Sequence, residues 1–121
     1  MALVLIVDAS PTDVHVMQTA LEQGGYRTAS AADGSEAIRK ARELHPDLIL
    51  MDIVMPGLNG FQATRELAAD PATRSIPVIM VSSKSQESDR VWGLRQGAVD
   101  YLVKPVTSDQ LLRKAQAAIA G

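Results

Sequence analysis

A small set of side chains suited to phosphate and metal chemistry occurs at intervals along the sequence, each directly after a short apolar run. In chain order they are Asp8, Asp52, Ser82 and Lys104. Carboxylates hold hard divalent cations, which in turn offset phosphoryl charge. An ammonium acts as a point charge toward phosphate oxygens, and an aspartate can itself be a nucleophile. These residue types therefore point to phosphoryl chemistry.

The side chains meet only if the apolar runs before them are neighbouring parallel strands. The runs do not alternate with polar residues, which is typical of strands covered on both faces. They are Leu3–Val7, Leu48–Met51, Ile76–Val81 and Tyr101–Val103, with a weaker fifth strand expected over Tyr26–Ser30. Function in an open parallel sheet gathers at the carboxyl ends of its strands, where these side chains would lie.

Helical patterns separate the strands. Ser10, Pro11 and Asp13 are typical of a helix start, and Gly24 of the end of the same helix. The other helices are expected over 35–45, 61–69 and 88–96, and after a capping box at Thr107 and Gln110. A strand followed by a helix, repeated along the chain, predicts an α/β fold with a parallel sheet and helices on both faces.

The composition limits the class of protein. The 121 residues fit one domain, and a net charge of −2 gives no indication of a nucleic-acid or membrane partner. Cysteine is absent, which excludes disulfides and thiolate chemistry. The apolar run Leu3–Val7 is too short to span a membrane and lacks the basic flank of a signal peptide. We therefore expect a cytoplasmic domain.

Each site residue also has a purely structural interpretation. An aspartate at a strand end often stabilises the following turn, and for Asp8 or Asp52 alone this interpretation has equal weight. Ser82 alone would be a turn residue, and Lys104 alone a surface lysine. Because each of them follows a different predicted strand, a common site is favoured over independent structural roles.

The same residues stand in motifs that resemble the CheY-like receiver domains of bacterial response regulators, from Leu3 to Ile119. The motifs are Asp8, Met51–Gly60, Val81–Ser82, Gly97–Tyr101 and Lys104–Pro105. Among receivers, the runs 51–65, 91–93 and 95–98 are most similar to the single-domain regulators of type IV pilus twitching motility.

The resemblance implies a fold and a phosphorylation site. It implies the flavodoxin-like strand order 2-1-3-4-5 and a single receiver domain over residues 1–121 with no output domain. Asp52 would accept a phosphoryl group from a histidine kinase or phosphotransfer domain. Asp8, Asp52 and the backbone carbonyl of Val54 would hold Mg²⁺. Lys104, followed by a cis peptide to Pro105, would contact the phosphoryl oxygens.

The resemblance also implies a signalling switch rather than an enzyme. Ser82 would move toward the phosphoryl group, and Tyr101 would turn inward as it does so. The partner, a downstream motility protein, would bind the face formed by the fourth helix, fifth strand and fifth helix. The only catalysis implied is Mg²⁺-dependent self-phosphorylation.

One position departs from the family. Most receivers have two adjacent acids after the first strand, whereas this chain has Asp8 and Ala9. The second acid is usually a direct metal ligand in the family, so we expect weakened Mg²⁺ affinity. We do not expect Asp13 to replace it, because Asp13 lies at the start of the next helix. The alternative function is a receiver that acts largely independently of phosphorylation.

Two other interpretations concern single features. A flavin carrier or an aspartyl phosphatase on the same topology is disfavoured, because the loop after Asp8 is not glycine-rich and Val54 stands where the phosphatase would have its second acid. Trp92 is expected in the core, since large aromatic side chains are mostly buried. His15 and His45 lie on separate predicted helices without the spacing of metal ligands.

Overall fold

Five parallel strands form one sheet, in the order β2-β1-β3-β4-β5, in the computed structural model of residues 1–121. The strands are β1 (Leu3–Val7), β2 (Arg27–Ala31), β3 (Leu48–Met51), β4 (Val78–Ser82) and β5 (Asp100–Val103). The helices are α1 (Pro11–Gln23), α2 (Gly34–Leu44), α3 (Gly60–Ala69), α4 (Glu87–Gln96) and α5 (Ser108–Ala120). The predicted fold class and strand order are confirmed.

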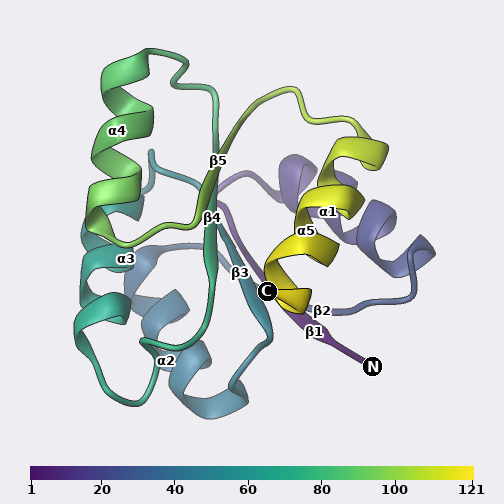
Figure 1. Cartoon of the computed structure of the whole chain (residues 1–121), viewed down its shortest axis with the longest axis horizontal. Coiled ribbons are helices and arrows are strands. Elements are labelled where there is room, and N and C mark those ends of the chain that lie inside the picture. Colours follow the sequence, from purple (N-terminus) through teal and green to yellow (C-terminus); the bar gives the residue numbers. More distant parts are fainter.

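The helices cover both faces of the sheet (Figure 1). α1 and α5 pack on one face, and α2, α3 and α4 on the other. Successive residues of β1 contribute to the two sides in turn: Val4 and Ile6 belong to the apolar cluster under α1 and α5, while Leu5 and Val7 belong to the opposite cluster. Both faces of a strand are therefore buried, which explains the unbroken apolar runs.

The element boundaries differ from the predicted ones by one or two residues, for local reasons. β4 begins at Val78 rather than at residue 76, because Pro77 has no N–H to donate to a sheet ladder. α2 begins at Gly34 because Asp33, and not a later residue, caps it by accepting a hydrogen bond from the Glu36 N–H at 2.8 Å.

The prediction that Trp92 lies in the core is wrong, since its side chain is 49% exposed. The only buried residue of α4 is Gly93. A Cβ on Gly93 would lie 3.2 Å from Met80 and 3.3 Å from Tyr101, so the helix approaches the sheet through its glycine. That close approach leaves the neighbouring tryptophan on the outer side.

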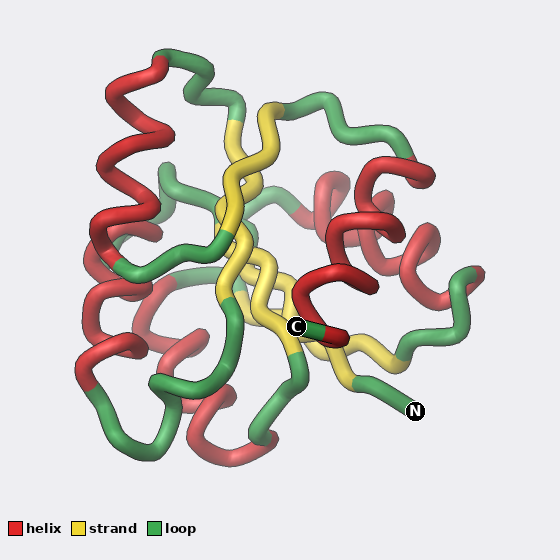
Figure 2. The backbone as a smooth tube through the Cα atoms, in the orientation of Figure 1, coloured by secondary structure: helices red, strands yellow, loops and turns green.

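The loops that follow the strands place the site at one edge of the sheet (Figure 2). All strand pairs are parallel, so the carboxyl ends of β1, β3, β4 and β5 meet there. The polar residues of the predicted site lie at the ends of these strands or directly after them: Asp8, Asp52, Ser82 and Lys104. None of the helices is long and apolar enough to cross a membrane.

Candidate functional site

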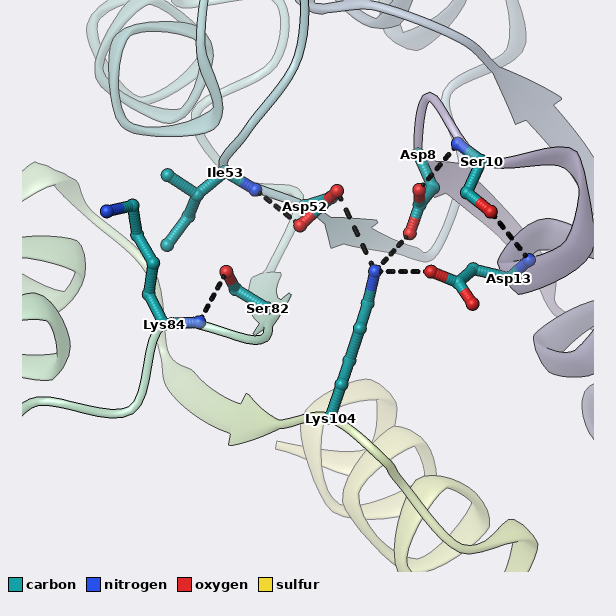
Figure 3. Close-up of polar contacts among 8 residues, drawn as sticks. All are labelled: Asp8, Ser10, Asp13, Asp52, Ile53, Ser82, Lys84 and Lys104. Carbon is teal, nitrogen blue, oxygen red and sulfur yellow. Dashed lines mark hydrogen bonds and ion pairs between the residues drawn. The ribbon is translucent and has the colours of Figure 1, made fainter.

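The ammonium of Lys104 lies among three carboxylates at the carboxyl edge of the sheet (Figure 3). Its Nζ is 2.7 Å from Asp8 Oδ2 and 2.9 Å from Asp13 Oδ2, both hydrogen-bond distances. Asp52 Oδ2 is farther away, at 3.7 Å. The lysine is therefore held toward the β1–α1 loop rather than against Asp52.

Asp52 is placed by the end of β3 and by the loop that folds back against it. Its side chain is 12% exposed, and its Oδ1 accepts a hydrogen bond from the Ile53 N–H at 2.8 Å. The first residue of α3, Gly60, donates its N–H to the Ile53 carbonyl at 2.9 Å. A Cβ on Gly60 would lie 1.9 Å from the Asp52 carbonyl oxygen, so only glycine permits this approach.

The surroundings of Asp52 disfavour its charge. Burial raises the pKa of Asp52 and the Asp8 carboxylate raises it further, while the Ile53 N–H and Lys104 lower it less, so the pKa stands above its usual value of 3.8. Burial lowers the pKa of Lys104, but the hydrogen bonds to Asp13 and Asp8 more than offset this, and its pKa is raised. The cluster therefore has an excess of negative charge that a further cation would relieve.

Asp8 is the most deeply buried acid of the group. Its side chain is 1% exposed, and its oxygens accept hydrogen bonds from the Ser10 N–H at 2.8 Å and from Lys104. Ser10 also caps α1, because its Oγ accepts from the Asp13 N–H at 3.3 Å. Ser10 therefore binds the carboxylate of Asp8 and the backbone N–H of Asp13.

Asp13, for which no role in the site was predicted, lies beside Lys104. Its carboxylate bonds to Lys104 although the residue lies in the first turn of α1. Side chains of a helix lean toward its N-terminus, so a residue in the first turn reaches back over the preceding loop. The acid of the predicted helix start was visible in the sequence. Its direction was the part that sequence reasoning missed.

Ser82 and Tyr101 both bind the backbone of Lys84 in the loop before α4. Ser82 is fully buried, and its Oγ accepts a hydrogen bond from the Lys84 N–H at 3.2 Å. The hydroxyl of Tyr101 donates to the Lys84 carbonyl at 2.7 Å. Burial of the tyrosine raises its pKa. These bonds tie the β4–α4 loop to the ends of β4 and β5.

The side chain of Tyr101 lies inward, with 7% of the residue exposed. The resemblance implies that this side chain turns inward as Ser82 moves toward the phosphoryl group, and that switch role stays a prediction.

Other predicted features are found where the motifs place them. The Lys104–Pro105 peptide is cis, as expected. Val54 follows Asp52 by two residues and is 64% exposed at the edge of the site. Ala9 is exposed beside the buried Asp8 and has no group that could bind a cation.

The residues present fit a magnesium ion by their chemistry. Mg²⁺ prefers hard oxygen ligands, and Asp8, Asp13 and Asp52 each have a carboxylate oxygen within 4 Å of the Lys104 ammonium. As the side chains lie, no three acids or histidines are grouped closely enough to hold a metal ion. The ammonium of Lys104 lies among them, so a metal would have to draw carboxylates away from the lysine.

Known proteins are similar to this chain in sequence and fold. Residues 4–116 match the model of the response regulator receiver domain family. The chain is 53% identical to the protein PilH of Pseudomonas aeruginosa over 121 residues, which cover 100% of both chains.

Two solved structures are also similar. The receiver domain of the sensor histidine kinase PA1611 from Pseudomonas aeruginosa, which has a magnesium ion coordinated in its active-site cleft, is 36% identical with a TM-score of 0.92, covering 99% of this chain and 98% of that one. The chemotaxis protein CheY4 of Vibrio cholerae is 31% identical with a TM-score of 0.91, covering 98% of both chains.

Proposed function

The chain belongs to the receiver domain family of response regulators, and from this premise we propose that it is a stand-alone regulator phosphorylated on Asp52. The observation that carries the proposal is the meeting of Asp52 with Asp8 and Lys104 at the carboxyl edge of the sheet. In the proposal the chain catalyses its own phosphorylation and signals by binding another protein, as a regulated binding module rather than an enzyme.

In the proposed reaction, a carboxylate oxygen of Asp52 attacks the phosphorus of a phosphohistidine on a kinase or phosphotransfer domain. An O–P bond forms, the P–N bond breaks, and its electron pair stays on the histidine nitrogen. Lys104, with its raised pKa, remains protonated and faces the incoming phosphoryl oxygens. Asp8, Asp52 and the Val54 carbonyl would hold Mg²⁺, which when bound offsets phosphoryl charge.

The proposed output is a change on the face made by α4, β5 and α5. This face has exposed apolar side chains in Val91, Trp92 and Val103, which are suited to a protein partner. The loop before α4 is held through the Lys84 backbone by Ser82 and Tyr101, so movement of Ser82 would be transmitted to that helix. By resemblance to the twitching-motility regulators, the partner is a motility protein in the cytoplasm.

A second candidate is a receiver that acts largely independently of phosphorylation. Ala9 removes one acid that receivers usually direct at the metal, and Lys104 is hydrogen-bonded to Asp8 and Asp13 rather than to Asp52. Both features would slow Mg²⁺-dependent transfer. The two candidates differ in whether the partner face changes when Asp52 is phosphorylated.

Amide hydrogen exchange tests the proposal. The chain is compared before and after treatment with a small acyl phosphate and Mg²⁺, with Asp52→Asn as the control. The proposal predicts changed exchange between Ser83 and Tyr101, through α4, and none in the control. Changes confined to α1 would contradict it. An unchanged α4 in protein shown by mass to be phosphorylated would favour the phosphorylation-independent candidate.

A further inference from the structure

The ammonium of Lys104 is hydrogen-bonded to two acids of the β1–α1 region but not to the proposed phosphorylation site. Figure 3 shows Asp8 and Asp13 on one side of the ammonium and Asp52 on the other. We propose that Asp13 is a positioning residue, which holds the ammonium away from Asp52 and releases it when a phosphoryl group arrives. This inference rests on the proposed function, because it concerns the phosphoryl transfer to Asp52.

The hydrogen bonds of Lys104 leave few of its donors for a phosphoryl group. An ammonium has three N–H donors and no acceptor. Two hydrogen bonds run to Asp8 Oδ2 at 2.7 Å and to Asp13 Oδ2 at 2.9 Å. Asp52 Oδ2, at 3.7 Å, lies within ion-pair range but beyond hydrogen-bond distance. A phosphoryl group brings three acceptor oxygens, so a second lysine bond to it requires that one of the two acids releases the lysine.

Asp13 is the acid that releases the lysine at the smaller cost. The Asp8 side chain is 1% exposed, and without Lys104 its carboxylate would be left with the Ser10 N–H as its donor. A buried charge that loses its partner is strongly destabilising. The Asp13 side chain is 43% exposed, so water can take the place of the lysine there. Release by Asp13 is therefore favoured over release by Asp8.

The surroundings of the pair leave room for this movement. Asp13 and Lys104 both line an open hollow, together with Val16, Pro105 and Val106. The backbone N–H of Asp13 is bound by the helix cap at 3.3 Å, whereas its carboxylate has no hydrogen bond apart from the one to Lys104. The carboxylate can therefore turn toward solvent while the start of α1 stays in place.

Phosphorylation rates test the inference. The initial rate of phosphoryl addition from a small acyl phosphate is measured by mass spectrometry for the wild type and Asp13→Asn, at MgCl₂ concentrations beyond which each rate no longer rises. The substitution keeps the shape of the side chain and removes its charge. We expect Asp13→Asn to react about two- to fivefold faster, the range in which loss of an exposed ion pair changes a rate. An equal or slower rate would overturn the inference.

The matched control is Glu43→Gln, which removes the charge of an acid that is 58% exposed and paired with Arg39 on α2. Its rate should equal that of the wild type, since exposed charges far from the site are strongly screened. A gain as large as that of Asp13→Asn would show that net charge alone sets the rate, and the inference would be wrong.

The double variant separates a hold on the lysine from a direct effect of charge. Removal of the Asp13 carboxylate also lessens its repulsion of the incoming anion, and this effect does not need Lys104. If Asp13 acts by holding the lysine, the gain from Asp13→Asn is smaller when Lys104 is Met than when it is Lys. A gain that is as large or larger in the Lys104→Met background rules the inference out.

NMR couplings across hydrogen bonds measure the release itself in the wild type. With MgCl₂ and no phosphodonor, Lys104 Nζ should couple to the carboxylate carbons of Asp8 and Asp13. Under a maintained excess of acyl phosphate, the coupling to Asp13 should vanish while that to Asp8 stays. An Asp13 coupling that is absent at the start, or that survives in protein shown by mass to be phosphorylated, contradicts the inference. A wild type that accepts no phosphoryl group contradicts the proposed function instead, and the mass identifies this case.

Discussion

At the scale of single residues, the site is an unequal balance between one ammonium and three carboxylates. Two of the acids are hydrogen-bonded to Lys104, and the third, Asp52, is left with one N–H donor and a distant charge. Burial and the Asp8 carboxylate raise the pKa of Asp52, and the hydrogen bonds to Asp13 and Asp8 outweigh the burial of Lys104 and raise its pKa. The residue proposed as the nucleophile is the one least compensated within the folded chain.

The raised pKa of Asp52 predicts how the metal-free protein responds to pH. The folded state binds this proton more tightly than the unfolded state, so ionising Asp52 works against folding. The stability that protonated Asp52 contributes to the folded state begins to fall as pH rises above 3.8 and is lost completely above the raised pKa. Asp52→Asn cannot ionise, yet it keeps an oxygen for the Ile53 N–H. In EDTA, the variant should therefore melt at a higher temperature than the wild type near neutral pH, and the difference should shrink as pH falls toward 3.8.

Asp70 provides a control of opposite sign. Hydrogen bonds from the Ala72 N–H and from Arg42 lower its pKa, so its ionised form stabilises the folded state above pH 3.8, and this is lost as pH falls through the lowered pKa. Asp70→Asn should reduce the melting temperature near neutral pH. A melting curve of Asp52→Asn that follows Asp70→Asn in sign would show that the account of Asp52 is wrong.

The site residues that could be predicted from the sequence are those at the ends of strands. Asp8, Asp52 and Ser82 follow directly from the strand ends, since parallel strands share one carboxyl edge. Asp13 was missed because its placement depends on the tilt of side chains in the first turn of a helix. The hydroxyl of Tyr101 donates to a loop carbonyl, a contact that no sequence pattern specifies.

At the scale of elements, strands were easier to predict than the outer faces of helices. The apolar runs of β1 and β3 have the same bounds in the sequence and in the structure, because burial on both faces leaves few polar substitutions possible. The helix α4 carries little such information. Its only buried residue is Gly93, so no apolar pattern marks its inner face. The expectation for Trp92 rested on residue type alone and was wrong.

The β3–α3 loop gives a prediction at this scale, because it holds Asp52 in place. Gly60→Ala should lower the free energy of unfolding by more than about 3 kcal/mol, above the usual cost of over-packing, since the new Cβ would overlap the Asp52 backbone. Gly57 lies in the same loop with φ +69 and open space around its Cβ position. Gly57→Ala should cost only about 1–2 kcal/mol of backbone strain.

Urea denaturation of the two variants measures both free energies. The comparison is matched in residue type and loop, and it differs in whether backbone atoms lie in the way. Equal losses for the two variants would mean that the close approach of Gly60 to the Asp52 backbone does not require glycine at position 60.

At the scale of the whole molecule, the topology is what makes one site from distant parts of the chain. Lys104 and Asp8 are separated by 96 residues in sequence and are hydrogen-bonded in the fold. The strand order places β1 and β3 side by side at the centre, with β5 reaching the same edge through the loop after it. We propose that the residues gathered at this edge serve the phosphorylation of Asp52.

Mass spectrometry of the protein treated with a small acyl phosphate and Mg²⁺ tests this proposal. We expect one added phosphoryl group, on the peptide that contains Asp52, with none in Asp52→Asn and an unchanged amount in the exposed-acid control Asp109→Asn. No phosphoryl group should be added to the wild type when EDTA is present during treatment. A phosphoryl group that persists in Asp52→Asn, or a wild type that accepts none, would show that Asp52 is not the phosphorylation site.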